Sequence, residues 1–321
     1  MPIGKKITPD HPSGQGASDH KNPAPEKPQA SHFDLLEPKY ELSDVIANTQ
    51  TLNEIQSLIS LKKDFEKVFG EMGFSKTHRY SKKFIVNFYG PPGTGKTITA
   101  HAIARTFGKK LLLIDYSEIE SKNVGETPKN IKKVFDFARK ENCIIFFDEA
   151  DAILSRRVTN MQNATDTSVN QTRSVLLNIL NDFEGDLIFA TNFISNYDPA
   201  FMRRISKHVF FDLPDQSSRR MLLEKYLPLP SRGLLNLEAI AAEITEGLSA
   251  ADIEKMALLA AFQACAAGRL ELTADDMANQ AQLIMKSKKE NEGAAPITTT
   301  RIVSENYVKD QMKNQEGVIS A

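Results

Sequence analysis

The run Gly90-Pro-Pro-Gly-Thr-Gly-Lys-Thr97 constrains what this chain can fold into more than any other feature. It matches the pattern G-x-x-x-x-G-K-[S/T] in full, and it stands between a short apolar run, 84–89, and a segment of helical spacing, 98–107. Glycines at these places let successive backbone N–H groups wrap phosphate oxygens, and a helix N-terminus adds the positive end of its dipole. We expect Lys96 to reach the β and γ phosphates and the Thr97 hydroxyl to bind Mg²⁺. The run therefore predicts a nucleotide-binding loop, and its context disfavours a chance Gly- and Pro-rich turn.

Strand and helix patterns alternate around this loop. The third apolar run, Cys143-Ile-Ile-Phe-Phe147, is apolar on both faces, as a buried parallel strand is. Such alternation predicts an α/β fold with a doubly wound parallel sheet and ligands at the carboxyl ends of its strands. After Pro214 only helical patterns follow, which predicts a small all-helical lid domain in which Ser249 caps the helix from Ala250. The apolar runs that predict strands are 84–89, 110–114, 143–147, 186–190 and 209–211.

Composition sets the domain limits and excludes several classes of protein. The 40 basic and 41 acidic residues give a net charge of −1, so the chain has no overall attraction to nucleic acid or acidic membranes. No apolar run approaches the roughly 18 residues of a membrane span, and 2 cysteines are too few for a disulfide framework or a zinc site. We therefore expect a cytoplasmic protein. The expected domains are a disordered N-terminal segment (1–38), a large α/β ATPase subdomain (39–213), a helical lid subdomain (214–287) and a polar C-terminal tail (288–321).

Polar side chains follow two of the expected strands. Asp148 and Glu149 come directly after the third run, where Asp148 is the natural Mg²⁺ partner and Glu149 can polarise an attacking water. By itself an acidic pair after a strand is as often a turn or a helix cap. With the phosphate loop upstream, the pair indicates a hydrolase. Asn192 ends the fourth run and can hold the attacking water, although Thr-Asn is also a common turn signal.

Together these motifs resemble the AAA family of ATPases, from about Tyr40 to Met285. The resemblance identifies 90–97 with the Walker A motif, 144–149 with Walker B and Asn192 with the sensor-1 position. Ser43-Asp-Val-Ile-Ala47 resembles the stretch that holds adenine, with alanine where the family usually has glycine. The nucleotide-binding residues that the motifs imply are Gly90, Pro91, Pro92, Gly93, Thr94, Gly95, Lys96, Thr97, Ile98, Val45 and Ile46.

The segment 198–204 resembles the family's arginine finger. The resemblance implies that Arg204, with Arg203 as second choice, reaches the nucleotide of a neighbouring subunit. The family usually has another arginine where this chain has Lys207, and lysine cannot form the bidentate fork, so a single-finger arrangement is the alternative. Ala250 and Ala251 occupy the sensor-2 turn without the arginine of several related clades, as is usual in the AAA clade itself.

The segment 121–126 resembles the loop that faces the pore of an AAA ring. Asn123 stands where severing and unfolding relatives have an aromatic residue, so the resemblance implies a weaker grip on a protein substrate by Lys122, Asn123 and Val124.

The resemblance implies ATP and Mg²⁺ as cofactors and a homo-oligomeric ring, a hexamer, that remodels or disassembles a protein complex, with or without an adaptor protein. Single-module relatives include remodellers of HORMA proteins in bacterial anti-phage operons, which suggests a role in antiviral defence. One alternative is a nucleic-acid-handling ATPase such as a loader or transposition regulator, which the neutral charge disfavours. Another is a non-hydrolysing scaffold, which Glu149 disfavours.

Overall fold

The computed structural model describes residues 33–78, 83–115, 126–155, 164–192, 197–233 and 235–293. All the helices and strands described below belong to one compact unit of the chain, Asp34–Ala321. The expected pore residues Lys122, Asn123 and Val124 lie outside the described residues.

A six-stranded sheet in the order β1-β3-β4-β5-β2-β6 organises the N-terminal part of this unit. All neighbours pair in parallel except β1, which runs antiparallel to β3 and places Leu35 opposite Leu112. The parallel doubly wound prediction is confirmed, with this one edge strand added. The strands are β1 (Leu35–Leu36), β2 (Phe84–Tyr89), β3 (Leu111–Asp115), β4 (Ile144–Asp148), β5 (Asp186–Thr191) and β6 (Lys207–Phe210).

Strand β1 lies inside the segment that composition predicts to be disordered, 1–38. Two leucines are too short a run to mark a strand by periodicity. They are ordered because the open edge of β3 offers them backbone hydrogen-bonding partners.

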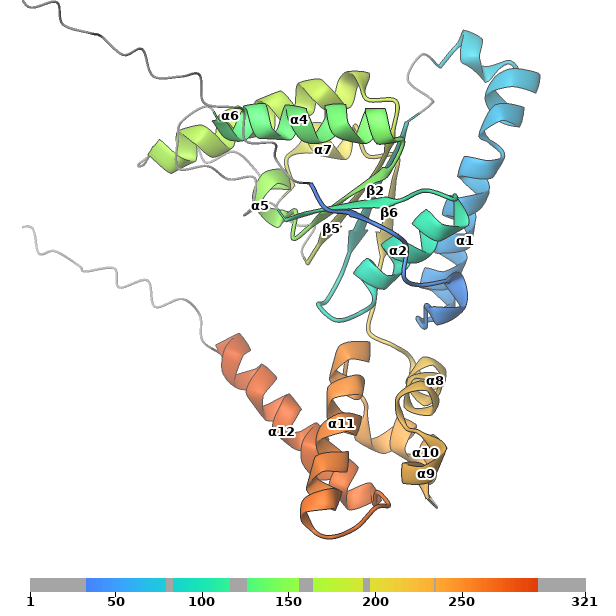
Figure 1. The fold of residues 1–321 in the computed structure, drawn as a ribbon, viewed down its shortest axis with the longest axis vertical. Helices are drawn as coiled ribbons and strands as arrows, with labels where there is room; N and C mark the ends of the chain where they lie inside the picture. Colours follow the sequence, from blue (N-terminus) through green and yellow to red (C-terminus); the bar gives the residue numbers. More distant parts are fainter. Residues whose placement is uncertain are drawn as a thin grey trace, which may run out of the picture. The chain divides into compact units, whose positions relative to one another are not determined.

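Helices cover both faces of the sheet (Figure 1). The side chains of β4 alternate between these faces, as the two-residue period of a strand requires. Phe146 belongs to the buried cluster that contains Ile59 and Ile103 of the helices on one face. Its neighbour Phe147 lies 6.2 Å, between ring centroids, from Phe135 on the other face. The helices are α1 (Thr49–Lys63) and α2 (Lys96–Thr106) on the first face, and α4 (Glu126–Glu141) and α6 (Ala164–Asp182) on the second.

Short elements join these layers. They are η1 (Leu42–Asp44), η2 (Lys67–Glu71), η3 (Phe74–Lys76), α5 (Asp151–Leu154) and α7 (Pro199–Met202).

Among its described residues the lid has helices as its only regular elements, and it has its own buried core around Leu223, Ile253 and Met277. Ser249 caps α11 as predicted, accepting a hydrogen bond from the Asp252 N–H. The last helix continues beyond the boundary expected at 287. The lid elements are α8 (Gln216–Tyr226), α9 (Leu229–Arg232), α10 (Leu237–Ala239), η4 (Ile240–Ile244), α11 (Ala250–Ala266) and α12 (Ala274–Gly293). Across the described part of the chain, the helices are all too short or too polar to cross a membrane.

Candidate active site

The phosphate loop connects the end of β2 to the start of α2, where the sequence predicts it. Its backbone has positive φ at Gly90 (142°), Gly93 (74°) and Gly95 (96°), which side-chain-bearing residues rarely adopt. A Cβ at Gly90 would lie 2.0 Å from the carbonyl oxygen of Phe211. The Thr94 hydroxyl donates to the Pro91 carbonyl at 2.8 Å and ties the loop to itself. Glycine is therefore required here by the path of the chain as well as by access for a phosphate.

Lys96, the first residue of α2, reaches across this loop. Its ammonium donates to the carbonyls of Gly90 (2.8 Å) and Pro91 (2.9 Å) and to Oδ1 of Asn192 (3.3 Å). Burial lowers the pKa of Lys96, and the carboxylates of Asp148 and Asp151 oppose that shift. The ammonium thus lies between the loop and the end of the sheet, close enough to the carboxylates of Asp148 and Asp151 to interact with their charge.

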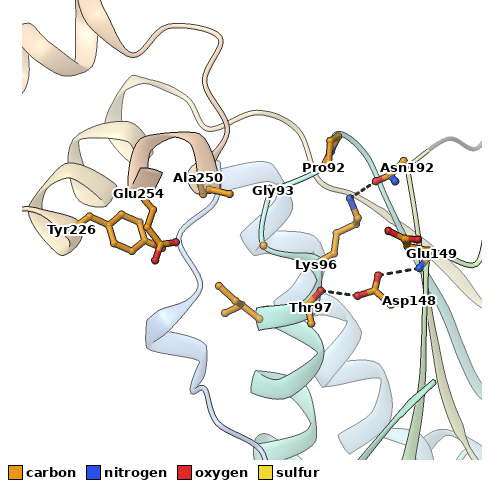
Figure 2. Close-up of a pocket in the computed structure, with 13 residues that line it drawn as sticks. Pro92, Gly93, Lys96, Thr97, Asp148, Glu149, Asn192, Tyr226, Ala250 and Glu254 are labelled. Atoms are coloured by element: carbon orange, nitrogen blue, oxygen red, sulfur yellow. Dashed lines mark hydrogen bonds between the residues drawn. The ribbon is translucent and has the colours of Figure 1, made fainter. Parts of the chain in front are cut away.

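Asp148, the last residue of β4, and Glu149 after it lie beside the start of α2, as predicted. Asp148 Oδ2 accepts from the Thr97 hydroxyl at 3.1 Å, and Oδ1 accepts from the Glu149 N–H at 3.0 Å (Figure 2). The backbone of Glu149 has φ of 50°, which is unusual for a residue with a side chain. This bend turns the chain immediately after the strand and leaves Glu149 exposed on the cleft. Strain of this kind is often retained at functional sites.

Asn192 follows β5, and its side chain contacts the Lys96 ammonium. Besides accepting from Lys96, it donates its backbone N–H to Asp151 Oδ2 at 3.1 Å. Asp151 starts α5, and sequence reasoning did not identify it. Asp151 is the third acid of the run Asp148-Glu-Ala-Asp151, and this run was the signal that the sequence offered for it.

Most of these residues, though not Gly90 or Asp151, line one cleft of about 290 Å³. Figure 2 shows Lys96, Thr97, Asp148, Glu149 and Asn192 together on one side, with Tyr226, Ala250 and Glu254 of the lid on the other. Sequence reasoning missed Tyr226 and Glu254, because each belongs to a helix whose pattern is explained by packing within the lid. The complete lining is Pro92, Gly93, Gly95, Lys96, Thr97, Ile98, Asp148, Glu149, Asn192, Tyr226, Ala250, Ala251 and Glu254.

Residues 86–213, which contain this phosphate loop and both acids, match the family model described as "ATPase family associated with various cellular activities (AAA)". This part of the chain is an AAA ATPase domain. It is therefore an ATP hydrolase, and the resemblance proposed from the motifs is confirmed.

Known relatives of the AAA domain include proteins of the proteasome. The chain is 31% identical over 249 residues to the 26S proteasome subunit RPT4 of Saccharomyces cerevisiae, covering 75% of this chain and 55% of that protein. It is 31% identical over 264 residues to a proteasome-activating nucleotidase of Saccharolobus solfataricus, covering 79% of this chain and 65% of that protein. The chain thus spans between about half and two thirds of the length of these relatives.

The predicted arginine fingers of the AAA domain lie outside its own cleft. Arg204 donates to Asn181 Oδ1 at 2.9 Å and to the Ala200 carbonyl at 2.7 Å. Together with Arg203 it lines a separate depression beside Lys83. Lys207 is instead part of β6, and its ammonium donates to the Glu54 carbonyl (3.3 Å) and the Ser57 hydroxyl (3.1 Å) of α1 in the same chain. In this structure Lys207 therefore contacts a helix of its own chain.

Val45 and Ile46, which the resemblance assigned to the nucleotide, do not line the cleft. Val45 is buried in the core of the sheet layer, and Ile46 packs against the core of the lid. The chain thus passes from one core to the other between these two adjacent residues.

Proposed function

We propose that this chain acts as a homo-oligomeric AAA ATPase that couples ATP hydrolysis to the remodelling of a protein partner. The observation that carries the proposal is the meeting of Lys96, Thr97, Asp148, Glu149 and Asn192 at one end of the sheet. Similarity to a proteasome-activating nucleotidase supports a protein as the object of the work.

Mg²⁺ fits the oxygen donors of this cleft. The Thr97 hydroxyl and Asp148 carboxylate lie within hydrogen-bonding distance of each other, at 3.1 Å. Mg²⁺ binds hard oxygen ligands and keeps several of its waters, so two protein oxygens are a sufficient set. The ion would neutralise negative charge on the β and γ phosphates.

The chain's own side chains bind the phosphates and activate the attacking water. The Lys96 ammonium exchanges the loop carbonyls for phosphate oxygens, whose negative charge makes them stronger acceptors. Glu149 accepts the proton of the attacking water, and the Asn192 side chain orients that water near the γ phosphate. Asp151 holds the backbone of Asn192 and so positions it. The arrangement separates binding from proton transfer, and this separation makes the two roles testable.

The test compares two cleft variants with a matched surface variant. Lys96→Ala is expected to lose nucleotide binding, because the phosphate cation is removed. Glu149→Gln should bind ATP as tightly as wild type and hydrolyse it about 10²- to 10⁴-fold more slowly. Glu141→Gln, a change at the exposed end of α4, is the control and should leave both properties unchanged. Equal turnover in wild type and Glu149→Gln would refute the assignment of the general base.

An oligomer is supported by two features of the described residues. Arg203 and Arg204 lie away from the cleft of their own chain, so they can contribute to hydrolysis only in a neighbouring subunit. The exposed side of α11 carries Leu258 and Phe262, which are 58% and 65% exposed and one helical turn apart. With Leu259, which is 36% exposed, they form a contiguous apolar surface, and such surfaces mark interaction sites more often than single exposed side chains do.

The protein partner can be trapped with the slow variant. Glu149→Gln protein, loaded with ATP, should retain its partner in a pull-down, whereas Lys96→Ala should not. The candidate partner from the sequence is a HORMA protein of a bacterial anti-phage operon, with the ATPase gripping it near Asn123. Recovery of nucleic acid in place of protein, with binding that falls steeply as salt rises, would favour the loader alternative.

A further inference from the structure

The cleft of the AAA domain has a second end with different chemistry. The phosphate end carries Lys96 and Thr97, whereas the lid end carries the phenol of Tyr226 and the carboxylate of Glu254. Figure 2 shows Glu254 beside the Tyr226 ring, facing the side of the cleft from which Lys96 and Thr97 project. A carboxylate lining a nucleotide cleft needs an explanation, because it repels the phosphate chain.

The position of Glu254 follows from a close contact between lid and phosphate loop. The Ala251 N–H donates to the Gly93 carbonyl at 3.1 Å. A Cβ at Gly93 would lie 2.7 Å from Ser249 Oγ, so only glycine allows this approach. Ala250 lies one helical turn before Glu254, and both line the cleft on the same side of α11.

The first turn of α11 is itself held firmly. Ser249 and Asp252 form a reciprocal capping box, and Lys288 of α12 pairs with Asp252 at 2.5 Å. At the other side of Glu254, Tyr226 is half-buried. Burial, and after it the charge and hydrogen bond of the adjacent Glu254, raise the pKa of Tyr226, so the phenol lies against the carboxylate. The Glu254 side chain is therefore held in position, and its carboxylate can accept further hydrogen bonds.

A nucleoside triphosphate whose phosphates lie at Lys96 presents its ribose next, and then its base, toward the lid. An ionised carboxylate only accepts hydrogen bonds. Of the groups on the nucleoside, the adjacent 2′ and 3′ hydroxyls form a pair of donors matched to its two oxygens. We propose that Glu254 accepts hydrogen bonds from the ribose hydroxyls and makes this ATPase selective for ribonucleotides over deoxyribonucleotides. The inference rests on the proposed binding of ATP phosphates at the loop.

Calorimetric titration of the full chain with ADP, 2′-deoxy-ADP and 3′-deoxy-ADP tests the proposal without turnover. Wild type should bind at least one deoxy analogue about tenfold more weakly than ADP, the lower end for a hydrogen bond to a charged group, since Glu254 is exposed. Glu254→Ala should lower the affinity for ADP to that for the deoxy analogue and abolish the discrimination. Glu254→Gln keeps one oxygen acceptor and should therefore retain part of the discrimination between ADP and the deoxy analogue.

The control is Glu243→Ala, which removes an exposed carboxylate from η4 of the lid, away from the cleft. It should discriminate as wild type does. Equal affinities of wild type for all three ligands, or unchanged discrimination in Glu254→Ala, would overturn the proposal.

The amino group of adenine is the other hydrogen-bond donor that Glu254 could bind. Titration with IDP, which lacks this amino group, tests that possibility. If Glu254→Ala loses discrimination between ADP and IDP while keeping that between ADP and its deoxy analogues, the ribose assignment is overturned. Failure of the wild-type chain to bind ADP at all would instead refute nucleotide binding at the loop, so the two failures are distinguishable.

Discussion

At Gly90 the chain has no room for a side chain. The Cα faces the backbone of Phe211, whose carbonyl oxygen would lie 2.0 Å from an added Cβ. Gly95 shares the positive φ, yet an added Cβ there meets nothing within 4 Å. The two glycines of one motif are therefore needed for different reasons, one for packing and the other for backbone conformation.

Substitution of these glycines separates the two requirements. Gly90→Ala should reduce the free energy of unfolding by about 3 kcal/mol or more, because β2 and the residue after β6 must move apart. Gly95→Ala should cost only about 1 kcal/mol, the strain of a side chain at positive φ. Urea unfolding of the nucleotide-free proteins measures both. Equal losses would contradict the contact between Gly90 and Phe211.

At the scale of an element, α12 depends on one buried carboxylate in its first turn. The side chain of Asp276 is 5% exposed and forms two hydrogen bonds of 2.8 Å with the Arg269 guanidinium. It also accepts from the N–H of Thr273 at 2.9 Å. The Arg269 hydrogen bonds, followed by those from Thr273, hold the pKa of Asp276 well below its ordinary value.

The stability of the lid should therefore fall in acid. Because the folded pKa is depressed, the stabilising contribution of Asp276 is complete above the unfolded pKa of about 3.9 and is lost as pH falls through the folded value. Asp276→Asn should lower the unfolding free energy by about 1–2 kcal/mol at pH 7, allowing for the part-exposed Arg269, and by less at pH 3.

Denaturant unfolding at the two pH values checks this difference. Asp275→Asn is the matched control, since Asp275 is an exposed acid of the same first turn and should change stability little at either pH. A gap between wild type and Asp276→Asn that is as large at pH 3 as at pH 7 would show that the ion pair is not its source.

At the scale of the whole molecule, hydrolysis should require more than one subunit. Arg204 is held by Asn181 and Ala200 at a depression separate from the cleft. We expect turnover per protomer to rise with protein concentration, and Arg204→Ala to bind ATP normally while turnover falls by on the order of 10³. Arg139→Ala, on the exposed end of α4, is the control.

Mixing variants gives a second test of the same role. Arg204→Ala combined with Glu149→Gln should recover some activity, because part of the interfaces then join an intact finger to an intact base. A rate per protomer that is independent of concentration across the micromolar range would rule out action between subunits.

Assembly should depend on the exposed side of α11. Phe262→Glu places a charge in the proposed interface and should weaken association at least about tenfold, with a matching loss of turnover at low concentration. Leu270→Glu changes a side chain that is 85% exposed in the turn after α11 and should assemble normally. Sedimentation velocity across a concentration series compares them. Equal weakening by both variants would point to a general effect of charge on the lid.

Local sequence patterns were enough to predict the proposed nucleotide site and the layers around it. The phosphate loop, the acids Asp148 and Glu149 and the amide of Asn192 were predictable because each follows an apolar run. Parallel strands bring their carboxyl ends to one edge, so residues at those ends meet whatever their distance along the chain. Local patterns were sufficient wherever function is attached to the end of a regular element.

Which distant segments touch that edge could not be predicted in this way, because it depends on packing between elements. Tyr226 and Glu254 reach the cleft because the Gly93 contact places α11 over the loop, and no local pattern encodes that approach. The same holds for β1, which is ordered by the free edge of β3, and for Lys207, whose ammonium meets α1 about 150 residues earlier. Such contacts depend on how elements pack after the sheet has formed, whereas periodicity records only whether a residue faces a core.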